Sequence, residues 1–187
     1  MKKRVKIGKY KTVFKGEIFT VLQAPAIFPG GRKATFERVC RDASVIILAL
    51  DDKSRLLLIR EYRIARKRYE WFLPAGRADK PGETPLMAAK REFREETKLI
   101  AKNMKLFYRT GWGNSLRWEK YYYIATNLKP DPHPLAGDED QDITIVPTLL
   151  SKAYKMALRG DIHKDDLAYS IIRLYQTRQK WLAQTSH

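Results

Sequence analysis

The stretch GRADKPGETPLMAAKREFREETKL, residues 76–99, is the most informative part of this chain. Its second half brings Glu92, Glu95 and Glu96 onto one helical turn, because residues three and four positions apart share a face of an α-helix. Carboxylates this close repel one another, and a divalent cation among their oxygens would offset the repulsion. Mg²⁺ is typical where one or two carboxylates leave room for water and phosphate. We therefore expect metal-assisted phosphate chemistry, and the alternative is a solvated, salt-bridged helix.

The residues around these acids support the expectation. Thr84 followed by Pro85 fits an N-cap with proline at the first helical position, so a helix is predicted to begin near Pro85. Arg91 precedes Glu95 by four residues, which predicts an ion pair that holds this carboxylate in place. Residues 73–76, LPAG, end an apolar run in a turn, so their backbone carbonyls can face the same metal.

Length and composition predict a soluble protein with one core. The 187 residues, of which 44% are hydrophobic, can bury one good core and a small N-terminal addition. Cys40 is the only cysteine, which excludes an intrachain disulfide and favours a reducing, cytoplasmic setting. The basic start MKKRVKIGKYK lacks the apolar segment of a signal peptide. The longest apolar stretch, residues 45–50, is far shorter than the roughly 20 residues of a membrane helix, so we expect no membrane span.

The formal net charge of +16 favours anionic partners, which include nucleotides, nucleic acid and polyphosphates. Seven lysines and arginines precede the first acid, Glu17. Such a segment is either an arm for RNA or a solvated tail. We favour the tail, because Tyr10 and Phe14 are too few to form a platform for stacked bases.

Hydrophobic patterning predicts a mixed α/β fold with mostly antiparallel strands. Residues 12–22 and 35–40 are expected to be strands joined through Pro25 and a turn at residues 29–31, and residues 43–50 a buried strand. Further strands are expected at residues 56–62, 105–110, 121–126 and 143–146. Helices are expected at residues 151–158 and 166–182, with Leu167, Ile171 and Leu174 facing inward.

The stretch at residues 76–99 resembles the box of the Nudix hydrolases: Gly, five residues, Glu, seven residues, Arg-Glu-apolar-any-Glu-Glu-any-Gly-apolar. The positions that agree are Glu83, the seven-residue gap, Arg91, Glu92, Phe93, Glu95, Glu96 and Leu99. Two positions depart from the box: six residues separate Gly76 from Glu83, and Lys98 stands where the family has glycine. An extra loop residue costs little, whereas lysine takes the backbone angles of a helix-ending glycine at a cost. Neither departure removes a metal ligand.

The resemblance implies an α/β fold of the Nudix type, an α/β/α sandwich with a mixed sheet over residues 43–187. A small N-terminal antiparallel β-sheet would precede it over residues 1–42. That segment, with EIFTV at residues 17–21, looks like the one through which the ADP-ribose and nucleoside-diphosphate-sugar branch commonly forms homodimers. The segment LLIREYR at residues 57–63 also resembles that branch.

The resemblance also implies roles for individual residues. Counterparts of Glu92, Glu96 and the carbonyl of Ala75 hold the divalent metal, Mg²⁺ with Mn²⁺ as a substitute, and Glu95 adds to this set. A glutamate in a loop well after the box often serves as the base, and its counterpart here is Glu139. The alternative for Glu139 is a solvated acidic turn.

Chemistry argued from the residues leads to the same reaction. Bound cations neutralise a diphosphate and activate coordinated water, and a carboxylate takes the proton. Arg60 and Arg63 can pair with phosphate oxygens, although Arg63 can equally form an ion pair with Glu61 or Glu70. Trp112 and Phe19 are candidates for stacking on a base or ribose, and the alternative for each is anchoring of the core or a loop.

The expected activity is hydrolysis of the diphosphate bond in ADP-ribose or a related nucleoside diphosphate sugar, giving a nucleoside monophosphate and a sugar phosphate. The ADP-ribose enzymes of the family often carry a proline in the loop after the box, and residues 110–114 contain none. GDP-mannose, NADH, dinucleoside polyphosphates and RNA 5′ ends therefore stay open as alternatives. The alternative from another class is a Nudix-like regulator that binds a nucleotide or nucleic acid without turnover, but such a protein would have lost box acids. The sequence has no phosphate loop ending in Gly-Lys-Ser/Thr and no Gly-x-Ser-x-Gly motif, which excludes those chemistries.

Overall fold

The structure, a computed structural model, describes residues 4–111, 113, 115–135 and 143–185, with side chains to residue 178. Its contacts divide the chain into two compact units. The first unit consists of Met1–Ala43 with Thr110–Lys120, and the second of Ser44–Arg109 with Tyr121–His187. Each unit is described by itself.

The first unit is a β-sheet. Its strands are β1 (Lys6–Ile7), β2 (Lys11–Lys15), β3 (Thr20–Ile27), β4 (Lys33–Cys40) and β10 (Leu116–Arg117). The order is β1-β3-β4-β10, and β2 also pairs with β3. The pairings of β3 with β1, β2 and β4 are antiparallel, whereas β10 runs parallel to β4.

The single strand expected at residues 12–22 is wrong. The chain turns after Lys15, where the Gly16 N–H donates to the Phe19 carbonyl at 2.9 Å, and β2 and β3 form a hairpin on either side of this turn. Pro25 is also not part of a connection. It lies within β3 opposite Thr35, and its carbonyl accepts a hydrogen bond from the Gly8 N–H at 2.8 Å. The connection is the turn at Gly30 and Gly31, both at positive φ, as glycine allows.

The described residues of the second unit form two sheets and three α-helices. One sheet has the order β8 (Ala75–Ala78), β5 (Ala43–Ala49), β11 (Lys120–Pro130), β9 (Leu99–Thr110). The other has the order β12 (Ile143–Leu149), β6 (Arg55–Arg63), β7 (Arg68–Phe72), and the short 3-10 helix η1 (Ile64–Arg66) connects β6 to β7. The helices are α1 (Pro85–Thr97), α2 (Leu150–Arg159) and α3 (Asp165–Thr185).

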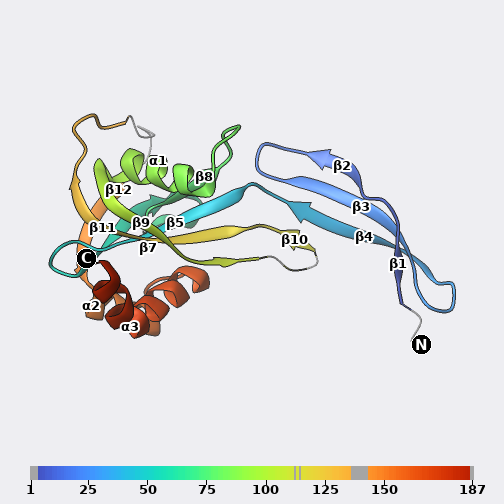
Figure 1. The fold of residues 1–187 in the computed structure, drawn as a ribbon. Coiled ribbons are helices and arrows are strands. Elements are labelled where there is room, and N and C mark those ends of the chain that lie inside the picture. The colour runs from blue at the N-terminus through green and yellow to red at the C-terminus, as the bar shows by residue number, and fades with distance from the viewer. Residues whose placement is uncertain (1–3, 112, 114, 136–142, 186–187) are drawn as a thin grey trace. The chain divides into compact units, whose positions relative to one another are not determined.

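The buried residues of β5 explain why helices cover both sides of this sheet. Successive side chains of a strand point to opposite faces, and here both faces are apolar. Ile46, Leu48 and Leu50 belong to one core cluster with α2 and α3, whereas Val45, Ile47 and Ala49 belong to a second with α1. Figure 1 shows α1 on one side of the strands and α2 with α3 on the other. This arrangement is the expected α/β/α sandwich.

The predicted helices are confirmed to within three residues at each end, and the inward set of Leu167, Ile171 and Leu174 is buried. Three strands of the second unit extend at least three residues further than expected: β9 begins at Leu99 instead of Lys105, β11 extends to Pro130, and β12 extends to Leu149. Within the described residues, the structure contains no helix that is long and apolar enough to cross a membrane.

Candidate active site

The helix that carries the acids begins where the sequence predicts. Thr84 is the N-cap of α1, and its hydroxyl oxygen accepts a hydrogen bond from the Met87 N–H at 3.3 Å. Pro85 follows at the first helical position, where its missing N–H costs nothing. Phe93 and Ala89 bury the inner face of α1, so the acidic face is directed away from the core. The apolar stripe therefore fixes which way the carboxylates point.

Arg91 connects three of the box glutamates. Its Nε and Nη2 donate to the two oxygens of Glu83 at 2.9 Å each, and its Nη1 donates to Glu92 at 2.8 Å and to Glu95 at 3.0 Å. The predicted pair with Glu95 is confirmed, and the two-pronged pair with Glu83 is an addition. The hydrogen bonds from Arg91 lower the pKa of the Glu83 carboxyl. Glu83 is therefore an ionised anchor for Arg91.

Gly76 leaves room for the Glu92 carboxylate. A Cβ atom at position 76 would lie 1.9 Å from Cδ of Glu92, so any side chain there would displace this carboxylate. The next residue, Arg77, donates its backbone N–H to Glu92 Oε1 at 3.1 Å. Burial raises the pKa of Glu92 in spite of its contact with Arg91.

Glu96 is the most perturbed acid of the site. Its Oε2 accepts a hydrogen bond from the Ala75 N–H at 2.9 Å, which ties the last turn of α1 to the start of β8. Burial raises the pKa of Glu96 to about 8, and repulsion by Glu92, Glu61 and Glu95 adds to the shift. Because so much negative charge lies around one buried carboxyl, the site disfavours ionised Glu96 unless a cation is near.

The donor set fits a hard divalent cation. Within the described residues, no three His, Cys, Asp or Glu side chains meet in a ready-made metal cluster, since Arg91 and backbone N–H groups hold several of the carboxylate oxygens. Glu92 and Glu96 nevertheless present oxygen donors of raised pKa, whose charge a cation would stabilise. Oxygen donors of this type suit Mg²⁺ and Mn²⁺.

The two arginines expected to bind phosphate lie on β6. Arg60 is exposed, and its guanidinium lies 5.0 Å from the ring centroid of Tyr69 and 5.6 Å from that of Trp71. Arg63 forms an ion pair with Glu61 at 2.9 Å and lies over the ring of Phe72. The ion pair that the sequence offered as the alternative for Arg63 is therefore present.

Three further predicted site residues do not join this cluster in the described structure. Phe19 belongs to the first unit, where its side chain is 42% exposed beside the turn between β2 and β3. Trp112 and Glu139 lie outside the described residues. The roles predicted for all three stay predictions.

Sequence reasoning missed Glu61 and the Arg77 carbonyl. The charge of Glu61, on β6, raises the pKa of Glu96, on α1, although 35 positions separate them in the sequence. The Arg77 carbonyl accepts a hydrogen bond from Arg91 Nη2 at 3.0 Å. Neither contact has a local sequence signal, because each joins a helix to a strand through the tertiary fold.

The C-terminal end of α1 is held by residues beyond the acids. Lys98 is the C-cap, in the left-handed conformation with φ 58°, and its Nζ donates to the carbonyls of Glu95 at 2.9 Å and Leu135 at 2.5 Å. Arg94 donates to both oxygens of Asp131, at 2.6 and 3.3 Å, and to the His133 carbonyl at 3.1 Å. The residues after β11 are therefore attached to the last turn of the acidic helix.

This fold and this arrangement of acids define the class of protein: the chain belongs to the Nudix family, since the family model of the NUDIX domain matches residues 41–159. It is a Nudix hydrolase similar to ADP-ribose pyrophosphatases. The one from Mycobacterium tuberculosis is 33% identical over 153 residues, which cover 81% of this chain and 74% of the relative. The one from Bacillus subtilis is 25% identical over 163 residues, which cover 85% of this chain and 86% of the relative.

Among solved structures, an ADP compounds hydrolase superposes with a TM-score of 0.78 at 25% identity, over 95% of this chain and 96% of the other. Nudix hydrolases generally use divalent metal ions.

Proposed function

We propose that this protein hydrolyses the diphosphate bond of ADP-ribose or a related nucleoside diphosphate sugar, using Mg²⁺ or, in its place, Mn²⁺. The products would be a nucleoside monophosphate and a sugar phosphate. The observation that carries the proposal is the half-buried pair of acids Glu92 and Glu96, of which Glu92 lies against Gly76 and is held by Arg91. The similarity to ADP-ribose pyrophosphatases from two organisms supports the choice of substrate class.

Glu92, Glu96 and the carbonyl of Ala75 would hold the metal, and Glu95 is close enough to Arg91 to be positioned beside them. When bound, the metal neutralises diphosphate oxygens and lowers the pKa of coordinated water. Without the metal, the ion pairs of Arg91 hold the carboxylates of Glu83, Glu92 and Glu95 in their orientations. We propose Glu139 as the base, a group that typically contributes about 10²–10⁴-fold in rate.

We propose that four further side chains position the substrate. Arg60 is exposed on β6 and can offer its guanidinium to a phosphate oxygen. Arg63 would have to exchange its contact with Glu61 for one with the substrate. We propose Phe19 and Trp112 as stacking partners of the base or ribose.

We also propose that the protein forms a homodimer through its N-terminal sheet. Paired residues on neighbouring strands share a face, and one such row is Phe14, Val21, Val39 and Leu116. Phe14 is 58% exposed and Leu116 is 42% exposed, so the row is apolar and uncovered at both ends. A second copy of the chain could cover it. Because the lone Cys40 can form no internal disulfide, we propose a cytoplasmic location.

The experiment that tests the proposed reaction is a substrate panel with Mg²⁺, with Mn²⁺ and with chelator. The panel contains ADP-ribose, GDP-mannose, NADH, a dinucleoside polyphosphate and 5′-triphosphorylated RNA, and it measures nucleoside monophosphate release. We expect metal-dependent release from ADP-ribose or GDP-mannose. Binding without turnover of any substrate would contradict the proposal and favour a regulator instead.

A further inference from the structure

The first unit carries a row of polar residues on the face opposite the apolar row. Strand pairing aligns Lys15 of β2 with Thr20 of β3, Thr20 with Cys40 of β4, and Cys40 with Arg117 of β10. Their side chains therefore share one face of the sheet. Two cations thus flank a hydroxyl and a thiol. With strands about 4.8 Å apart, the Cα atoms of the outer two lie roughly 14 Å apart, a span over which two long cationic side chains can meet.

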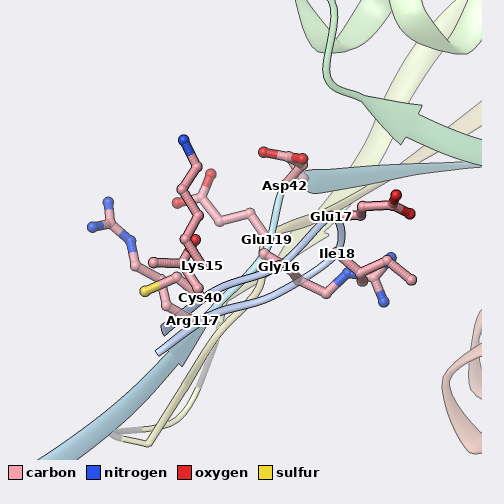
Figure 2. A pocket seen from close by; sticks show the side chains of 11 residues that line it. Lys15, Gly16, Glu17, Ile18, Cys40, Asp42, Arg117 and Glu119 are labelled. Carbon is pink, nitrogen blue, oxygen red and sulfur yellow. The ribbon is translucent and has the colours of Figure 1, made fainter. Parts of the chain in front are cut away.

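All four residues of this row line one pocket, which has a volume of about 460 Å³. That volume is in the usual range for small-molecule sites. The remaining lining comes from the turn after β2 and the ends of β4 and β10, namely Gly16, Glu17, Ile18, Arg41, Asp42, Ala43 and Glu119. Figure 2 shows Lys15 of β2, Cys40 of β4 and Arg117 of β10 on one side of the pocket, while Glu17 and Ile18 lie on the other. None of these residues belongs to the box.

The lining offers two kinds of polar contact. Lys15 and Arg117 are exposed, and within the described residues neither forms an ion pair with an acid, so both can bind an anionic group. Arg41 lies against the ring of Trp118, with its guanidinium 4.1 Å from the ring centroid, which fixes its direction. Glu17, Asp42 and Glu119 supply carboxylates, which accept hydrogen bonds from hydroxyl groups.

We propose that this pocket is a second ligand site and that it binds a phosphorylated sugar. Lys15 and Arg117 take the phosphate, and the carboxylates of the lining accept hydrogen bonds from the sugar hydroxyls. A purely anionic ligand fits less well, because three acids share the lining with the three cations. An uncharged sugar would leave the two unpaired cations without a partner.

Calorimetric titration of the full chain with ribose 5-phosphate tests the proposal, with inorganic phosphate and free ribose as separate arms. The titration contains chelator and no divalent metal, so that metal at the box makes no contribution. We expect ribose 5-phosphate to bind more tightly than either fragment. Lys15→Gln and Arg117→Gln should each weaken binding about tenfold or more, as loss of a hydrogen bond to a charged group predicts. Lys33→Gln is the matched control, because Lys33 is exposed on the same sheet and pairs with Ile27, on the opposite face.

Cys40 gives an independent readout of the same pocket. It is the only cysteine of the chain and is half-buried in the lining, so the rate of its alkylation by a maleimide reports on one site. Bound ribose 5-phosphate should slow this reaction in the wild-type protein and not in Lys15→Gln. Glu96→Gln should change neither readout.

Each other outcome overturns the assignment. If inorganic phosphate binds as tightly as ribose 5-phosphate, the pocket is an anion site without a sugar subsite. Equal binding by the wild type, Lys15→Gln and Arg117→Gln, or an unchanged alkylation rate, would place the ligand elsewhere. Weakened binding in Glu96→Gln would assign the sugar phosphate to the box.

Discussion

Among its single residues, the candidate active site has more carboxylates than its one arginine, Arg91, can neutralise. Arg91 forms ion pairs with Glu83, Glu92 and Glu95, whereas Glu96 accepts a hydrogen bond from the backbone N–H of Ala75. One guanidinium cannot neutralise four carboxylates. Burial, together with the charge that is left over, therefore raises the pKa values of Glu92 and Glu96. The unbalanced part of the cluster is therefore the part that a metal would stabilise.

The first prediction concerns Glu96→Gln. The pKa of Glu96 is about 8 in the folded chain and near its ordinary value of 4.5 in the unfolded chain. Between these pH values the folded state binds more protons, so the free energy of unfolding falls as the pH rises through this window. Glu96→Gln removes this contribution of Glu96 to the pH dependence of the free energy of unfolding. We expect the metal-free variant to lose less thermal stability than the wild type between pH 5 and pH 9, and to lose most of its turnover with metal.

Thermal denaturation across this pH range, with turnover measured in parallel, checks both parts. Asp52→Asn is the control, since Asp52 is exposed in the turn between β5 and β6. Near-normal turnover by a folded Glu96→Gln protein would refute the assignment of Glu96 as a metal ligand. Parallel stability curves for variant and wild type would refute the raised pKa.

The second prediction concerns Gly76→Ala. The new methyl group would overlap Cδ of Glu92, and because this carboxylate ends a flexible side chain, it can move away without unfolding the protein. We expect near-normal stability together with affinity for Mn²⁺ reduced by about 10–100-fold, as for other changes that misplace a metal ligand. Mn²⁺ binding followed by electron paramagnetic resonance measures the affinity directly. Gly111→Ala is the control, because nothing lies within 4 Å of a Cβ at that position. Unchanged Mn²⁺ affinity in Gly76→Ala would show that Glu92 does not need its present position.

At the scale of elements, the start of α1 could be predicted and the small strands could not. Thr84 and Pro85 are a local signal, so they located the helix without knowledge of the fold. The break between β2 and β3 depends on one glycine, Gly16, in an otherwise strand-like run, and β10 is only two residues long. Such elements exist because neighbouring strands pair with them. The same holds for the candidate site. The sequence predicts the acids of α1 from their local spacing, but it does not predict that Glu61 of β6 acts on Glu96.

The third prediction concerns Lys98, which stands where the Nudix box has glycine. A left-handed backbone costs an ordinary residue about 1–2 kcal/mol, and glycine avoids most of this cost. Lys98→Met keeps the cost and loses the donor to Glu95 and Leu135, whereas Lys98→Gly loses the donor and also the cost. We expect the glycine variant to have the larger free energy of unfolding of the two, by about 1 kcal/mol. Urea unfolding measures the difference. If the two variants unfold at the same urea concentration, the conformation of Lys98 is not strained.

At the scale of the whole molecule, the charge is distributed unevenly between the two units. The first unit contains thirteen lysines and arginines against four acids in only 54 residues. It also presents the apolar row of Phe14, Val21, Val39 and Leu116. The same sheet can therefore serve self-association through one face and contact with anions through its cations.

The fourth prediction tests self-association. If a second copy covers the apolar row, the full-length chain is a dimer at micromolar concentration, and Phe14→Glu dissociates it by placing a charge in the interface. Thr12→Glu is the matched control, since Thr12 is exposed on the same strand and pairs with Leu22, which puts it on the opposite face. Light scattering of the three proteins gives the mass. A monomeric full-length protein would rule out the dimer.

The last prediction uses ionic strength to separate substrate classes. Long RNA bound by many cations releases counterions, so its apparent affinity falls steeply with salt, by a slope close to the number of phosphates contacted. A sugar nucleotide held by one metal site and a few arginines releases few counterions, so its apparent affinity should depend only weakly on salt. We expect kcat/KM for ADP-ribose or GDP-mannose to change little between low and high salt, and the hydrolysis of 5′-triphosphorylated RNA to be slow at both. Lys11→Gln with Lys33→Gln, both exposed on the first unit, should leave the sugar-nucleotide rates unchanged. Faster cleavage of the RNA with a steep salt slope, reduced by these two substitutions, would make RNA 5′ ends the substrate and the basic first unit its binding surface.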